Sequence, residues 1–116
     1  KILIWKLHTF VNENNHIIMP KMTETMTSAT QLLKALANQK RLEILYILDK
    51  ENEKSDGDIL PAVGITQSAL SQHLAKLREY NLVKTRRDAQ TIYYSIKCDK
   101  LRSLLRSIRD LYKEAA

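Results

Sequence analysis

The sequence contains only two glycines, two prolines and one cysteine among its 116 residues. So few turn-forming residues argue against a β-sandwich or a β-barrel, because both need many tight turns. A single cysteine can form neither a disulfide within the chain nor a cysteine-based zinc site, and we expect a reducing, cytoplasmic location. No stretch approaches the roughly 18 consecutive apolar residues of a membrane span, so we expect no contact with a membrane.

The positive charge is concentrated in one part of the chain. The formal net charge is +6, yet residues 28–63 carry five basic and six acidic side chains, whereas residues 64–97 carry six basic and two acidic ones. A positive field on one side favours a polyanionic partner such as nucleic acid. The alternative, a basic protein that is merely soluble, stays open on charge alone.

Residues 1–27 differ in character from the domain that we predict over residues 28–116. An apolar cluster near the beginning is followed by a polar, Asn-rich stretch that ends at Met19-Pro20-Lys21 and predicts a linker. The cluster lacks the cleavage site of a signal peptide. Two interpretations remain open: sequence upstream of a start at Met19, Met22 or Met26, or an additional helix that packs on the domain or on a partner subunit.

The domain begins with three predicted helices. Leucines recur at helical spacing behind a Thr27-Ser28 cap. Asn38 is predicted to cap a second helix over 39–50, which is apolar nearly all round and therefore buried. A short helix over 56–63 follows, and Gly64 ends it.

The next helix carries the most informative pattern. Thr66 is a natural cap for a helix that runs to about Tyr80, in which three leucines fall within one narrow arc. The opposite face is small and hydrogen-bonding, which suits a close approach to base edges. Together with the preceding helix and turn it forms the pattern of a helix-turn-helix. The side chains that we assign to DNA contact on this helix are Gln67, Ser68, Ser71, Gln72, His73 and Lys76.

A β-hairpin is predicted after this helix. Residues 82–87 have the composition of a strand, residues 88–90 form a turn, and residues 91–96 alternate between apolar and polar. A hairpin directly after a recognition helix is a wing, whose tip can reach the minor groove or phosphates, and we assign Arg86, Arg87 and Gln90 to that role. The predicted fold is mainly α with a β-hairpin wing, a winged helix-turn-helix of order α-α-α-α-β-β-α.

Asp99 is predicted to cap a final helix that extends to about Ala115. This helix carries an apolar stripe that a single small domain would struggle to cover, so we expect a homodimer. The stripe assigned to dimerisation consists of Leu101, Leu104, Leu105, Ile108 and Leu111. Arg102, Arg106 and Arg109 recur on the same helix, and a solvated face is the simpler interpretation for them.

These elements, in this order, resemble the ArsR/SmtB family of bacterial winged-helix repressors, and most closely its HlyU and BigR branch. The likeness is carried by the runs Leu33–Leu42 and Gln67–Leu74, by Leu77-Arg78 and by residues 82–94. The resemblance implies a homodimer joined by its first and last helices, which adds Leu32 and Leu33 to the dimer contacts. It also implies operator binding by two winged helix-turn-helices and repression that an effector relieves.

The positions at which members of this family hold metals or reactive thiols carry other residues here. Ser55 and Gly57 stand where one metal site has cysteines, and no histidine follows His73 for a site on the last helix. Tyr46 and Lys113 occupy the positions of two sulfur-sensing cysteines. We therefore expect no metal and no cofactor, and an operator affinity that zinc, arsenite and polysulfide leave nearly unchanged; the effector is unknown.

Cys98 and His73 each have two interpretations. Cys98 lies beside Lys97 and Lys100 before a helix, an environment that favours a reactive thiolate and hence a redox switch. A small, half-buried side chain is the simpler alternative. His73 lies at the edge of the apolar arc, so that it either reaches a phosphate or packs as a hydrogen-bonded histidine.

No catalytic arrangement is visible. The sequence has no Gly-rich phosphate loop, no His-Glu-x-x-His pattern and no nucleophile beside a plausible base. We predict instead a sequence-specific transcriptional regulator, a repressor, that binds an inverted-repeat operator in double-stranded DNA as a homodimer. The alternative is a winged-helix module for protein–protein contact, which would lack the steep salt dependence of DNA binding.

Overall fold

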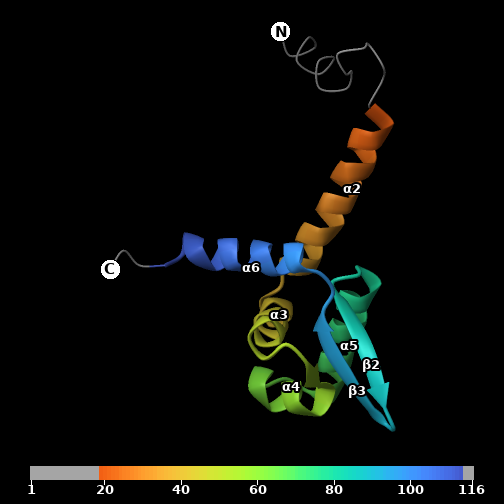
Figure 1. Cartoon of the computed structure of the whole chain (residues 1–116), viewed down its shortest axis with the longest axis vertical. Helices are drawn as coiled ribbons and strands as arrows, with labels where there is room; N and C mark the ends of the chain where they lie inside the picture. Colours follow the sequence, from red (N-terminus) through yellow and green to blue (C-terminus); the bar gives the residue numbers. More distant parts are fainter. Residues whose placement is uncertain (1–18, 114–116) are drawn as a thin grey trace. The chain divides into compact units, whose positions relative to one another are not determined.

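A computed structural model of the chain describes residues 19–113. Its elements, in order, are α2 (Met19–Leu36), α3 (Gln39–Glu51), β1 (Lys54–Ser55), α4 (Asp56–Val63), α5 (Gln67–Glu79), β2 (Val83–Asp88), β3 (Thr91–Ile96) and α6 (Asp99–Leu111), as Figure 1 shows. This order confirms the predicted helices and hairpin and adds the short strand β1. Within the described residues, no helix is long and apolar enough to cross a membrane.

Helix α2 begins earlier than the sequence predicts. Pro20 lies in its first turn, where the missing N–H is no loss, because the first N–H groups of a helix have no intrahelical partner. The hydroxyl of Thr27 donates to the carbonyl oxygen of Thr23 at 3.0 Å, as in a helix interior. The predicted cap at Thr27-Ser28 and the linker character of residues 19–21 are therefore wrong. The apolar cluster near the beginning of the chain lies outside the described residues.

By its internal contacts the chain divides into two units, between Lys34 and Ala35. The domain boundary that we predict from the sequence, between residues 27 and 28, lies inside the helix α2. The core of the second unit consists of apolar side chains from every element between the end of α2 and α6 except β1. They are Ala35, Leu36, Ile44, Leu45, Leu48, Ile59, Val63, Leu70, Leu74, Leu77, Leu82, Val83, Tyr94, Ile96, Leu101 and Leu105.

The three strands form one antiparallel sheet of order β1-β3-β2. The hairpin pairs Val83 with Ile96 at its base and Asp88 with Thr91 at its tip. Strand β1 pairs Ser55 with Tyr93 on the other edge of β3. Two residues are too few to show alternation, which is why the sequence pattern does not predict β1.

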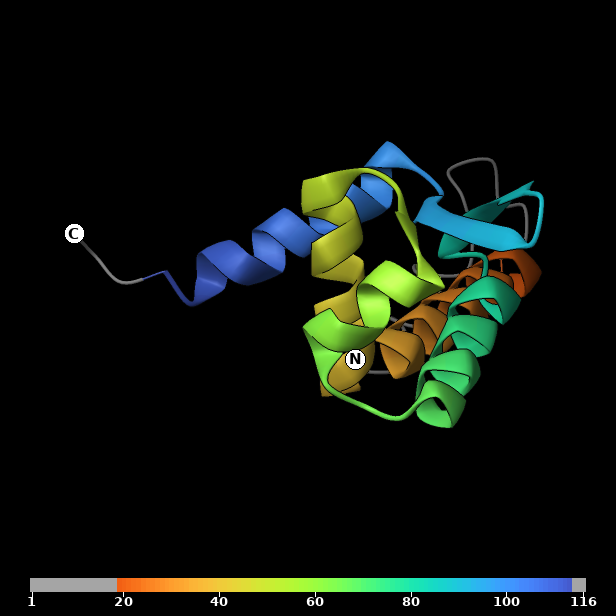
Figure 2. The ribbon, with the colours of Figure 1, turned by 90° about the horizontal axis from the view of Figure 1, so that it is seen from below.

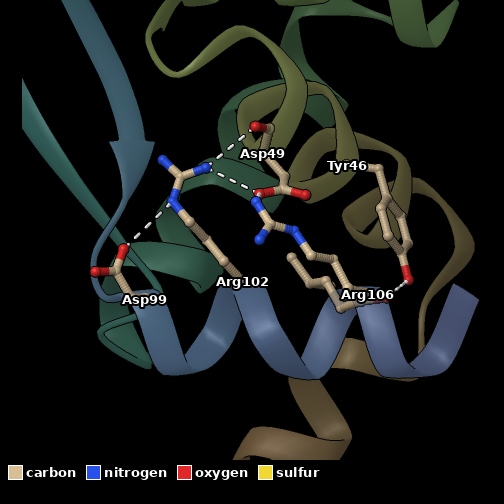
Figure 3. Close-up of polar contacts among 6 residues, drawn as sticks. Tyr46, Asp49, Asp99, Arg102 and Arg106 are labelled. Carbon is tan, nitrogen blue, oxygen red and sulfur yellow. Dashed lines mark hydrogen bonds and ion pairs between the residues drawn. The ribbon is translucent and has the colours of Figure 1, made fainter.

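Helix α6 is joined to α3 by polar contacts around one carboxylate (Figure 3). Arg102 donates through Nη1 to Oδ1 of Asp49 at 2.9 Å and to the Asp49 carbonyl oxygen at 3.1 Å. Arg106 donates to the same Oδ1 at 3.4 Å, and the hydroxyl of Tyr46 donates to the carbonyl oxygen of Leu105 at 2.5 Å. Two of the three arginines that we expected on a solvated face therefore pair with an acidic residue.

Replacement of Asp49 by alanine should lower the free energy of unfolding by about 2–3 kcal/mol. The side chains of Asp49 and Arg102 are only 7% and 17% exposed, so the substitution leaves a largely desolvated guanidinium without its partner. Urea denaturation at one fixed protein concentration measures the loss. The matched control is Asp110→Ala, which removes a 59%-exposed carboxylate paired with Lys113 and should cost less than about 0.5 kcal/mol. Equal losses for the two variants would contradict this account.

Candidate nucleic-acid interface

Local capping fixes both ends of the connection between α4 and α5. Gly64 ends α4 in the left-handed conformation, with a φ of 65°, and its N–H donates to the carbonyl oxygen of Leu60 at 3.2 Å. Thr66 begins α5, because its hydroxyl accepts a hydrogen bond from the N–H of Ala69 at 3.1 Å. The structure thus confirms the predictions that Gly64 ends the helix α4 and that Thr66 caps α5. A short connection of three residues, 64–66, therefore joins α4 to α5 (Figure 2).

Helix α5 has a buried side and an exposed side. Leu70, Leu74 and Leu77 on the buried side are at most 3% exposed. The exposed side presents five of the predicted DNA-contacting side chains, namely Gln67, Ser68, Ser71, Gln72 and Lys76. Nε2 of Gln67 donates to the hydroxyl of Ser71 at 3.4 Å. Because these glutamine and serine side chains are small, their amide and hydroxyl groups can approach base edges in the major groove closely.

The last turns of α5 bring charged side chains next to this exposed side. Lys76 forms an ion pair with Glu79 at 3.3 Å and lies 5.7 Å from the centre of the Tyr80 ring. His73 is half-buried at the boundary between the two sides of the helix. Burial, together with the nearby positive charge of Arg41, lowers the pKa of His73 below its ordinary value. Both effects favour the neutral form of the His73 ring in the unbound protein.

The tip of the hairpin points away from α6 (Figure 1). It closes through the two-residue turn Ala89–Gln90, in which Ala89 has a φ of 56°, a conformation that favours glycine. Arg87 and Gln90 are exposed, and Arg87 has no ion pair with any side chain that the structure describes. Arg87 is therefore well placed to contact a phosphate.

Arg86, in contrast, is engaged within the protein. Its Nη2 and Nε donate to the two carboxylate oxygens of Glu53 at 2.8 and 3.1 Å, and its guanidinium lies 4.4 Å from the centre of the Tyr93 ring. The hydrogen bond raises the pKa of Arg86 and lowers the pKa of Glu53, so both groups stay ionised. Arg86 would therefore have to break its ion pair with Glu53 before its side chain could reach DNA from the wing. The role of Glu53 cannot be predicted from the sequence, because no periodic signal connects residues 33 positions apart.

The junction before α6 differs in detail from the prediction. Cys98, rather than Asp99, is the N-cap of α6, and its side chain makes no capping hydrogen bond. Asp99 lies in the first turn, where its negative charge interacts favourably with the helix dipole. The thiol of Cys98 is exposed, so the simpler alternative of a half-buried side chain is wrong.

The two positions that the family resemblance assigns to sulfur-sensing thiols line one groove. Tyr46 of α3 and Lys113, which follows α6, line it together with Leu42, Ile108 and Tyr112. The hydroxyl of Tyr46 is committed to a carbonyl oxygen of α6, and burial raises the pKa of this phenol. Nowhere in residues 19–113 do three His, Cys, Asp or Glu side chains come together in a way that could hold a metal ion.

The residues assigned to dimerisation divide into two groups. Leu101 and Leu105 are 6% and 0% exposed, so they belong to the core of the subunit and present no surface to a partner. Leu104 and Ile108 are half-buried, and Leu111 is 77% exposed. The C-terminal half of α6 projects beyond the rest of residues 35–113 in both views (Figures 1 and 2). On α2, Leu32 is half-buried and Leu33 is 61% exposed.

Comparison with known proteins identifies the family. Residues 38–85 match the family described as bacterial regulatory protein, arsR family. The chain is 52% identical over 93 residues to the nodulation protein NolR of Rhizobium meliloti, an alignment that covers 80% of this chain and 75% of the relative. The chain belongs to the ArsR family. It is also 40% identical over 97 residues to the transcriptional activator HlyU of Vibrio cholerae, covering 84% of this chain and 89% of that one.

Solved structures of similar proteins agree with this assignment. NolR from Sinorhizobium fredii superposes with a TM-score of 0.74 at 50% identity, over 83% of this chain and 95% of NolR. A homodimeric winged helix-turn-helix DNA-binding domain from Mycobacterium bovis superposes with a TM-score of 0.73 at 27% identity, over 78% of this chain and 83% of that one. The chain is thus a transcriptional regulator with a DNA-binding winged helix-turn-helix. The matched family consists of regulatory proteins, and HlyU is a transcriptional activator, which confirms the prediction that the chain is not an enzyme.

Replacement of Glu53 by glutamine should tighten DNA binding by about two- to fivefold, the range expected when one exposed ion pair is lost. The substitution releases Arg86 and removes a negative charge beside the wing. Titration of a DNA duplex at two salt concentrations measures the effect. The control is Glu51→Gln, which removes the same charge from an exposed residue that has no ion pair with any described residue. If both variants behave alike, the pairing of Arg86 with Glu53 has no bearing on DNA binding.

Proposed function

We propose that this ArsR-family chain binds an inverted-repeat operator in double-stranded DNA as a homodimer and represses the promoter that contains it. One observation carries the proposal. The exposed side of α5 presents small hydrogen-bonding side chains, while the opposite side is anchored in the core by Leu70, Leu74 and Leu77. A helix held in this way can enter the major groove without changing its own orientation.

The candidate contacts fall into two classes. Ser68, Ser71 and Gln72 are proposed to read base edges, because a glutamine amide can pair with adenine through two hydrogen bonds. Gln67 contacts Ser71 and supports its position. The side chains proposed to contact the backbone, and so to set the register on the duplex, are His73, Lys76, Arg87 and Gln90.

The dimer is proposed to form through the projecting part of α6. Leu104, Ile108 and Leu111 lie on one face there, and the solved relative from Mycobacterium bovis is described as homodimeric. Leu32 and Leu33 of α2 are proposed as further dimer contacts. Binding to an inverted repeat requires a two-fold axis between the subunits that places the two copies of α5 about 34 Å apart, one turn of DNA.

Regulation is proposed to follow from where the operator lies. A dimer bound to an operator that overlaps a promoter would exclude RNA polymerase and so repress transcription. The relative HlyU of Vibrio cholerae is instead named an activator. Zinc, arsenite and polysulfide are expected to leave operator affinity nearly unchanged, because an effector acts only through a difference in its affinity for two states. We place this activity in the cytoplasm, and we leave the effector open.

Replacement of Gln72 by alanine should relax discrimination at one operator position by about 1–3 kcal/mol. Arg87→Ala should instead weaken binding to all sequences alike and reduce the salt slope by about one, because a phosphate contact carries no sequence information. Equilibrium titrations against a panel of single-base operator variants, at several salt concentrations, separate the two effects. If Gln72→Ala keeps both affinity and preference across the panel, the assignment of α5 as the recognition helix is wrong. A binding affinity that does not depend on the salt concentration would favour a protein–protein interaction module instead.

Replacement of Leu111 by glutamate should weaken the homodimer at least about tenfold, because a carboxylate would be buried in an apolar interface. Leu111 is 77% exposed in the subunit, so the folded monomer should tolerate the change. Sedimentation equilibrium measures the dissociation constant. Ser103→Glu is the matched control, since it adds the same charge at an exposed position of α6 away from the apolar stripe. A wild-type monomer that still binds operator tightly would refute the dimer.

A further inference from the structure

A pocket open to solvent lies between α3 and α5, directly beside the exposed side of the recognition helix. It has a volume of about 490 Å³ and is lined by Arg41, Gln72, His73, Ala75, Lys76 and Glu79. Gln72 belongs both to this lining and to the exposed side of α5, so the pocket continues the surface that we assign to DNA. A duplex seated on α5 would therefore bring its backbone to this pocket.

The lining has the charge that a phosphodiester requires. Arg41 of α3 is positioned by its Nε, which donates to the carbonyl oxygen of Ala35 at 2.7 Å. Lys76 supplies a second cation, and Glu79, the single acid of the lining, is paired with it at 3.3 Å. Helix α4 and strand β2, which also pack against α5, contribute no lining residue. The charged and titratable groups that face His73 across the pocket are thus two cations and one paired carboxylate.

We propose that this pocket receives one backbone phosphate of the bound DNA and that His73 is protonated when the phosphate is in place. Operator binding is then coupled to the uptake of one proton per subunit, and the affinity for DNA rises as the pH falls. The inference rests on the proposed DNA-binding function and adds to it a titratable phosphate contact.

The sign of the coupling follows from the surroundings of His73. In the unbound protein, burial and the charge of Arg41 lower the pKa of His73 and so favour the neutral ring. A phosphate beside the ring favours its charged form and raises the pKa in the complex. Between the two pKa values, binding takes up a proton. Below the lower value and above the higher value, the affinity no longer depends on the pH through this group.

The experiment is a titration of an operator duplex with the full chain between pH 6 and pH 8 at constant ionic strength. The affinity of the wild type should rise as the pH is lowered, by up to about tenfold per pH unit for each proton taken up. His73→Gln should abolish this slope, and at pH 6 it should bind the duplex more weakly than the wild type, because it cannot take up the proton. The control variant, in which His8 and His16 are both replaced by glutamine, should keep the slope.

A second measurement does not depend on the folding of a variant. The imidazole proton resonances of His73, followed by NMR, should give a pKa below the ordinary histidine value in the unbound chain and a higher pKa in the complex with the duplex. An unchanged pKa, or a pH slope that survives in His73→Gln, would overturn the inference while leaving DNA binding intact. Failure of the wild type to bind any duplex at any pH would instead refute the proposed function itself.

Discussion

Leu70, Leu74 and Leu77 are buried along one side of α5, where the helix packs against α3, α4 and β2. Complete burial of a leucine side chain contributes about 1.5–3 kcal/mol, whereas a typical hydrogen bond contributes about 1 kcal/mol net. Apolar packing therefore decides how α5 is rotated about its axis, and the polar contacts follow. Because the leucines cannot turn outward without a large loss, Ser68 and Gln72 must face solvent. The surface proposed to read DNA is thus a consequence of the core.

Helix α6 combines two roles on different faces. Its inner face is fixed to the subunit by Leu101, Leu105 and the contacts of Arg102 and Arg106 with Asp49. Its outer face carries the exposed apolar side chains near the C-terminal end. Because the inner face holds α6 to α3, and α3 packs against α5, a dimer formed through the outer face would hold its two recognition helices at a fixed separation. Rigid spacing of this kind is what an inverted repeat requires.

Features of the fold that have a local physical cause could be predicted from the sequence. Caps act within three residues, so Asn38 and Thr66 mark the beginnings of α3 and α5 correctly, and the leucine spacing alone shows which side of α5 is exposed. Features whose cause lies far away in the sequence could not be predicted. Glu53, which pairs with Arg86, directly precedes the strand β1. This strand has only two residues, too few for a pattern that predicts a strand. The beginning of α2 was missed because Pro20 suggests a linker, although a proline in the first turn of a helix is tolerated.

A selection of bound duplexes from a random-sequence library, performed with the full chain, tests the central claim most directly. The account predicts an enriched inverted repeat whose two half-sites have centres about 10 base pairs apart, or a multiple of that spacing, since each subunit presents one copy of α5 to successive major grooves on one side of the duplex. Enrichment of an isolated half-site without a symmetric partner, or no enrichment at all, would contradict it.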